Sequence, residues 1–314
     1  MNRPDPSPEP PAGNPQPAAP EAPAEEHRPA LGAEFREMVC ELVHYRELLW
    51  QMVLRDIRIR YKQAVMGLGW AVLMPMIIVA AGFLVKYAMA QIAGKGLEAD
   101  SLNGMAVKAL GWSFFVGAIG FATNSLTGNI ALVTKIYFPR EVFPLSAVLT
   151  QAFDSAIGST VLALLLFTLA GLSLSLQTLW AVPLIVLLFL MTAGLALFLS
   201  CANVFFRDVK YLVQVIIAFG IFFTPVFYEP QFFGPTGSVL MMLNPLAPLL
   251  EGLRLAVVEH RSLLETVVFT AADGGEILAW QPWYLLYSAA WAVLGFLGAW
   301  LMFHKLEFIY AEYI

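Results

Sequence analysis

Charged residues and cysteines are scarce in this sequence. Only 13% of its 314 residues are charged and 59% are hydrophobic, whereas soluble globular domains carry roughly 25% charged and 45–50% apolar residues. This shortage of charge excludes an ordinary soluble domain and predicts a membrane protein. The net charge of −5 is less informative, because the local charge beside each apolar segment decides its orientation.

The cysteines give no sign of a disulfide or a metal site. Cys40 and Cys201 are the two cysteines, with no CxxC pair and no histidine at ligand spacing beside them. Both fall where the chain is expected to face a reducing compartment. We interpret them as unpaired packing thiols.

Motifs for chemistry within the chain are also missing. The nucleotide-binding pattern GxxxxGK[ST] is absent, and the nearest fragment, AGKGL at 93–97, lacks both its spacing and its Ser/Thr. Asp154 is the only clear acid within a predicted span, and the histidines are scattered: His27, His44, His260 and His304. We therefore expect no catalytic, metal or cofactor site here, and any ATP chemistry must come from a partner.

Residues 1–30 are rich in Pro, Ala and Glu, with almost no large apolar side chain. Such a segment buries too little surface to offset the entropy of ordering, so disorder is predicted. It also lacks the basic start and apolar run of a secretory signal peptide. We expect three regions: the tail 1–30, a cytoplasmic amphipathic helix at 35–63, and a membrane domain at 64–314.

The segment 35–62 carries a helical pattern. One apolar stripe follows the spacing i, i+3, i+4, i+7 and i+11, at Trp50, Val53, Leu54, Ile57 and Tyr61. The cations Arg55, Arg58 and Lys62 lie off this stripe. The pattern is typical of a helix that lies in the membrane interface, and an ordinary basic flank of the first span is the alternative.

Six spans are predicted from apolar runs of about 20 residues. They cover 65–90, 107–133, 145–172, 179–206, 211–228 and 283–304. The stretch 229–281 is broken by Pro235, Pro245 and Pro248, and predicts one or two short re-entrant or interfacial helices. Cations favour one side throughout, with Lys95 and Lys108 as exceptions on the expected first outer loop, so both termini are predicted to be cytoplasmic.

The short loop KIYFPREVFP at 135–144 mixes aromatic, charged and proline residues. Tyr137, Phe138 and Phe143 would be apolar anchors, and Arg140 and Glu141 would supply a polar rim, as at a protein–protein hot spot. A lipid-contacting loop is the alternative from composition alone.

Four segments occur in an order that resembles a known family. They are LRDIRIRYKQAVMGLGWAVLMP at 54–75, TKIYFPREVFPLSAVL at 134–149, FFRDVKYLVQVIIAFGIFFTPVFY at 205–228 and LNPLAPLLEGLR at 243–254. Together they resemble the permease subunits of ABC transporters that export O-antigen, related polysaccharides and teichoic acids. The similarity runs from about residue 45 to the C-terminal AEYI.

The resemblance implies an all-α membrane protein with six transmembrane helices, an N-terminal interface helix and short gate helices between spans five and six. It also implies a homodimer in the bacterial inner membrane that pairs with two copies of a separate ATPase subunit, which would hold ATP and Mg. A polyprenyl-pyrophosphate-linked polysaccharide would pass between the two copies. No nucleic-acid partner is expected.

The resemblance also assigns roles to segments. The coupling helix that docks into the ATPase would comprise Lys135, Tyr137, Phe138, Pro139, Arg140 and Glu141. The interface helix would comprise Trp50, Arg55, Asp56, Arg58, Arg60 and Tyr61. The gate segment would contain Asn244, Pro245, Glu251 and Arg254.

Aromatic side chains along a pore can stack on sugar rings, and the candidates for this path are Trp70, Trp112, Phe222, Phe223 and Tyr228. Interfacial or lipid-facing residues are the alternative for each of them. Two other functions remain open for the chain: an ABC permease for a drug or another lipid, and a membrane-embedded transferase that modifies a glycan.

Overall fold

The computed structural model describes residues 31–313, apart from gaps at 63, 95, 97–98, 134–137, 170–172, 174 and 271–275. The predicted disordered tail lies outside the described residues. So do Lys135 and Tyr137 of the predicted coupling helix.

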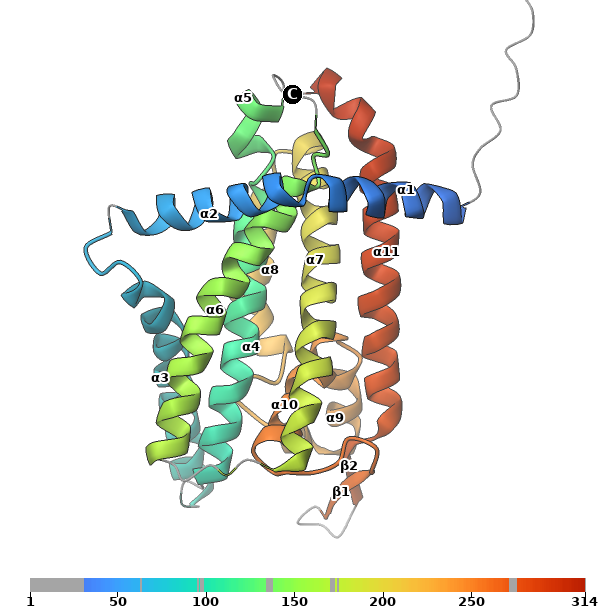
Figure 1. The fold of residues 1–314 in the computed structure, drawn as a ribbon. Helices are drawn as coiled ribbons and strands as arrows, with labels where there is room; N and C mark the ends of the chain where they lie inside the picture. The colour runs from blue at the N-terminus through green and yellow to red at the C-terminus, as the bar shows by residue number, and fades with distance from the viewer. Residues whose placement is uncertain are drawn as a thin grey trace, which may run out of the picture.

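Two helices lie across one end of a helical bundle (Figure 1). They are α1 (Leu31–His44) and α2 (Arg46–Lys62), separated by a turn at Tyr45. The sequence predicted one helix over this region, and the structure divides it in two. Val53 of the predicted stripe is 2% exposed, whereas Trp50 is 58% exposed, so only part of the stripe packs inward.

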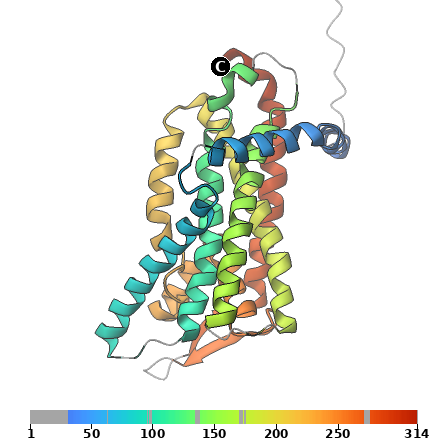
Figure 2. The same cartoon turned by 60° about the vertical axis from the view of Figure 1, so that its left-hand side comes forward.

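Within the described residues, five helices are long and apolar enough to span a membrane. They are α3 (Gly69–Ala93), α4 (Ala99–Thr123), α6 (Val142–Leu169), α7 (Ala181–Phe205) and α11 (Pro282–Tyr313). The shortest of these helices has 25 residues, which is about 37 Å of helix and more than the roughly 30 Å of hydrocarbon in a bilayer. Figure 2 shows that α3 is inclined relative to the others.

Two predicted spans differ from the observed helices. The second, predicted at 107–133, is α4 at Ala99–Thr123, because Lys108 lies inside the helix rather than in a loop. The fifth, predicted at 211–228, is helical only over Val209–Phe223, the 15-residue α8. A hydropathy argument ends a predicted span next to a charged residue. Lys108 instead lies within α4 and is fully buried.

Short elements connect the long helices. The 3₁₀ turn η1 (Thr127–Asn129) and α5 (Ile130–Val133) follow α4 at the end that carries α1 and α2, and η2 (Leu176–Trp180) precedes α7. The C-terminal end of α11 also lies at the α1/α2 end (Figure 1).

The chain between α8 and α11 folds at the opposite end of the bundle (Figure 1). It contains η3 (Pro230–Phe233), α9 (Gly234–Met242), α10 (Leu246–Val257) and a hairpin of β1 (Val267–Thr270) and β2 (Glu276–Trp280). The strands are antiparallel, with Phe269 opposite Ile277. The predicted short helices are α9 and α10, and the hairpin was not predicted. We name this the α10 end.

The core forms where α4, α6, α7, α10 and α11 meet, and small residues permit close packing there. Ala109, Ala193, Ala196 and Ala247 are fully buried. A Cβ at Gly194 of α7 would lie 2.7 Å from Cα of Phe296 on α11, so only glycine fits this contact. This packing fixes α7 against α11.

Candidate functional site

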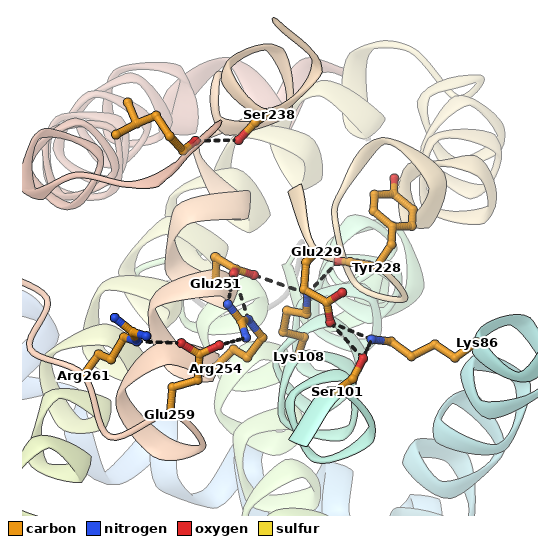
Figure 3. Close-up of polar contacts among 11 residues, drawn as sticks. Lys86, Ser101, Lys108, Tyr228, Glu229, Ser238, Glu251, Arg254, Glu259 and Arg261 are labelled. Atoms are coloured by element: carbon orange, nitrogen blue, oxygen red, sulfur yellow. Dashed lines mark hydrogen bonds and ion pairs between the residues drawn. The ribbon is translucent and has the colours of Figure 1, made fainter. Parts of the chain in front are cut away.

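A buried ionic network lies at the α10 end. Lys108 of α4 and Glu251 of α10 are both fully buried, and Lys108 Nζ lies 3.3 Å from Glu251 Oε2 (Figure 3). Lys108 also donates a hydrogen bond to the Tyr228 carbonyl at 2.7 Å. A buried charge is tolerated only when it is paired and hydrogen-bonded, so this contact joins α4 to α10 and to the chain after α8.

The network continues along α10 and beyond it. Arg254 lies one turn after Glu251 and donates from Nε to Glu251 Oε1 at 2.8 Å. Arg254 also pairs with Glu259, which in turn pairs with Arg261 at 3.0 Å (Figure 3). Cations and carboxylates therefore alternate from Lys108 to Arg261.

A second group lies beside it. Lys86 of α3, 7% exposed, pairs with Glu229 at 2.6 Å, and the Ser101 hydroxyl donates to Glu229 at 3.2 Å (Figure 3). The groups bring α3, α4 and the segment after α8 together. Ser238 of α9 donates to the Leu278 carbonyl of β2 at 2.8 Å, which ties the hairpin to the same end.

The predicted gate residues lie around α10. Glu251 and Arg254 belong to the ionic network described above. Asn244 donates to Thr224 Oγ1 at 2.9 Å and accepts from the Leu246 amide at 3.1 Å, so it links the start of α10 to the end of α8. The Pro245 carbonyl accepts from Ser288 of α11 at 2.8 Å. The gate segment is therefore held to α4, α11 and the end of α8.

Sequence reasoning missed Lys86 and Lys108 as partners of this segment. Each is a lysine within a mainly apolar stretch, and an ionisable residue inside a span is by default a candidate for function. That signal was present in the sequence. The sequence did not identify the partners of these lysines, since Lys108 and Glu251 are 143 positions apart.

An apolar groove of about 840 Å³ opens between α7, α8 and α11. Its lining includes Trp112 of α4, Phe223 of α8 and Trp291 of α11. Two of the predicted path residues therefore meet there. Trp70, Phe222 and Tyr228 are not among the residues that line this groove. Trp70 is 41% exposed on α3, and the Tyr228 hydroxyl donates to the Phe222 carbonyl.

At the α1/α2 end, α2 is clamped onto α6. Arg60 of α2 pairs with Asp154 of α6 and donates to Gln151 at 3.2 Å. The Arg60 guanidinium also lies 4.0 Å from the centre of the Phe121 ring. Tyr61 donates a hydrogen bond to Asp154, and burial together with this carboxylate raises the pKa of Tyr61 above its usual value.

The remaining predicted interface residues are less buried. Arg58 is exposed, and Arg55 pairs with the neighbouring Asp56 at 2.8 Å. Asp56 also lies 3.5 Å from Ser146 Oγ of α6. The cations of α2 thus divide into Arg60, which fixes the helix to α6, and Arg58, which remains accessible.

The described part of the predicted coupling helix packs inward. Phe138 is 5% exposed and contacts Phe143, with ring centroids 5.4 Å apart. The Arg140 amide donates to Glu307 Oε1 at 3.1 Å, and Arg140 Nη1 donates to the Glu307 carbonyl at 2.9 Å. Pro139 is buried, and Glu141 is 2% exposed. This stretch is therefore attached to α11, and its assignment as the coupling helix remains a prediction.

These features define a multi-pass helical membrane protein, with two helices lying across one end and the buried helix α10 at the other. The model of the ABC-2 type transporter family matches residues 47–258. The match covers more than half of the chain, and the chain belongs to this family.

Curated relatives carry a more specific name. The chain is 28% identical over 249 residues to the O-antigen export system permease protein RfbA of Myxococcus xanthus, covering 77% of this chain and 92% of that protein. It is 27% identical over 218 residues to a protein of the same name from Klebsiella pneumoniae, covering 68% and 81%.

Proposed function

We propose that this chain is the transmembrane subunit of an ABC transporter that exports an O-antigen-like polysaccharide linked to polyprenyl pyrophosphate. The family match over 47–258 carries the proposal, and the printed names of the relatives supply the substrate class. A separate ATPase subunit hydrolyses ATP with Mg, and two copies of each subunit assemble in the bacterial inner membrane.

The α1/α2 end faces the cytoplasm in this proposal. Arg55, Arg58 and Lys62 lie on α2, and the positive-inside bias keeps such cations on the cytoplasmic side. The described end of α11 lies at the same end of the bundle, so both termini are cytoplasmic. The α10 end, with its hairpin, then faces the outer side.

A second copy would face α3 and α8. In its most apolar stretch α3 is 17% buried, less than any other long described helix. Trp70 on α3 and Phe222 and Phe223 on α8 are exposed. Exposed aromatic surfaces on two helices support a glycan path between the copies, where rings stack on sugars without holding one sugar tightly.

The segment 135–141 couples this chain to the ATPase. Because Arg140 is bonded to Glu307 of α11, a displacement of this segment is transmitted to the last span. Phe138 and Glu141 would act inside the protein as the transmitting contacts. Lys135 and Tyr137, which lie outside the described residues, are proposed from the sequence as the contacts with the ATPase.

Co-purification of the ATPase tests this proposal. We expect Tyr137→Ala to reduce the ATPase recovered with a tagged permease at least tenfold and to stop glycan export. Phe167→Ala is the control, because Phe167 is an aromatic side chain that is 56% exposed on α6, a helix that is not proposed to face the second copy. Unchanged recovery with Tyr137→Ala would disprove the coupling assignment. Continued export after mutation of the partner's nucleotide-binding motif would disprove the ABC mechanism itself.

A strain that lacks this chain distinguishes the two alternative functions. A permease for a drug or another lipid would leave surface polysaccharide intact when the chain is deleted. A glycan-modifying transferase would change the structure of the surface polysaccharide without stopping its export.

A further inference from the structure

Three potential metal ligands meet at the α1/α2 end. His304 and Glu307 lie one turn apart on α11, and Glu141 lies immediately before α6. One ligand atom from each residue can be chosen so that all three lie within 4.8 Å of one another. His304 Nδ1 is 3.7 Å from Glu141 Oε1. Sequence analysis predicted no metal site, and Glu141 lies 163 positions before His304.

Two atoms of this group are buried without a hydrogen-bond partner among the described residues. They are Glu141 Oε2 and His304 Nδ1. Glu141 is 2% exposed, and its other oxygen accepts from Trp300 Nε1 at 3.4 Å. A buried carboxylate oxygen without a partner is costly and requires an explanation. A bound cation would supply the missing partner for both atoms.

A cavity of about 500 Å³ adjoins the group. His304 and Glu307 line it, and α1 contributes Cys40, Glu41 and His44 to the same wall. Cys40 and His44 are four positions apart and share one face of α1. The cavity therefore offers space for an ion and a choice of further ligands from a third element.

The charges around this cavity are mainly negative. The carboxylates of Glu37, Glu41 and Glu307 line it, and Glu141 adjoins it. Arg140 contacts this group through Glu307. A divalent cation would balance the excess of acid.

We propose that Glu141, His304 and Glu307 bind a divalent first-row transition ion of the Zn²⁺ type. Imidazole nitrogen and carboxylate oxygen are common ligands of Zn²⁺. His304 would ligate through Nδ1, and the fourth position would be filled by Cys40, Glu41 or His44 of α1 or by water. The ion would fasten α1, the start of α6 and α11 together. This site goes beyond the transport function and does not depend on it.

Direct metal binding tests the site. The full chain is purified in detergent through a tag without histidine, stripped with EDTA, exchanged into chelator-free buffer and titrated with Zn²⁺ by calorimetry. We expect about one tight Zn²⁺ per chain, as a single structural site requires. His304→Asn and Glu141→Gln should each weaken binding at least tenfold.

His260→Asn is the matched control. His260 lies beside Ser173 and Ser175, away from the cluster, and its backbone has φ of 53°, which asparagine tolerates. This variant should bind Zn²⁺ as the unchanged chain does. Equal Zn²⁺ binding by His304→Asn, Glu141→Gln and the unchanged chain would overturn the proposal, as would no binding by the unchanged chain.

Thermal stability separates loss of the site from loss of folding. Zn²⁺ should raise the melting midpoint of the unchanged chain and of His260→Asn, because a ligand of the folded state stabilises it. It should not raise that of Glu141→Gln or of the milder variant Glu307→Gln. If all four proteins shift equally, the cluster is only an ion pair between His304 and Glu141.

Discussion

Two buried charged clusters lie at opposite ends of this bundle, and they are built differently. At the α10 end, Lys108 and Arg254 surround Glu251, and every one of these side chains has a charged partner. At the α1/α2 end, Glu141 is equally buried, yet its Oε2 has no hydrogen-bond partner among the described residues. The first cluster supplies a cation for each of its carboxylates, and the second leaves one buried carboxylate oxygen without a described hydrogen-bond partner.

The difference has a physical consequence for each end. Where fixed cations match the carboxylates, the charges hold α10 in one arrangement against α4. Where carboxylates exceed fixed cations, the protein retains affinity for an added cation. The same substitution, Glu to Gln, should therefore cost much more stability at the α10 end than at the α1/α2 end.

The largest effect is expected for Glu251→Gln. Neutralising this carboxylate leaves Lys108 and Arg254 buried without their shared anion, and breaking a buried pair costs about 3–5 kcal/mol. Much less folded protein should be recovered in detergent, with a lower melting midpoint. Glu265→Gln, at an exposed position, is the control. A midpoint equal to that of the control would show that the network does not hold α10.

An intermediate effect is expected for Asp154→Asn, which breaks the clamp between α2 and α6. Arg60 keeps its contacts with Gln151 and Phe121, so the loss should be about 1–3 kcal/mol. Hydrogen exchange at the amides of α2 should become faster, while α10 remains protected. Asp208→Asn, at an exposed position, should change neither. Unchanged exchange in α2 would mean that other contacts hold this helix.

The smallest effect is expected for Glu141→Gln measured in EDTA. The Gln oxygen still accepts from Trp300. The substitution removes the ion pair with His304 but also a buried carboxylate oxygen with no hydrogen-bond partner in the described chain, and because these two effects oppose each other, stability should change by less than about 1 kcal/mol. A loss as large as that of Glu251→Gln would show that the Glu141–His304 pair is itself a major stabilising contact. The comparison between the two ends would then fail.

Local pattern and composition predicted the class of protein, the surface position of α2 and the broken segment that becomes α9 and α10. These features depend on residues close together in the chain. The position of Lys108 could not be predicted this way, since a hydropathy argument assigns a lysine to a loop unless its partner is known. Glu251 supplies that partner from 143 positions away.

The sequence predicted more of the residues at the α10 end of the bundle than of the contacts at the α1/α2 end. The residues around Pro245 were predicted as a gate through the resemblance, and they lie just before α10 and within it; their role as a gate stays a prediction. Phe138 and Glu141 were predicted to belong to the coupling helix, which stays a prediction, and both side chains are buried beside α11. The cluster of Glu141, His304 and Glu307 was not predicted. Only His304 and Glu307 are close in sequence, and their spacing of three positions is common on helices.

The central claim, that this chain exports a lipid-linked polysaccharide, is tested most directly by following that glycan in cells that lack the chain. Surface polysaccharide is measured on intact cells, and lipid-linked polysaccharide is extracted from their membranes. The account predicts that surface polysaccharide disappears while the complete lipid-linked form accumulates inside, and that the unchanged chain restores export. Normal surface polysaccharide in the deletion strain would contradict it.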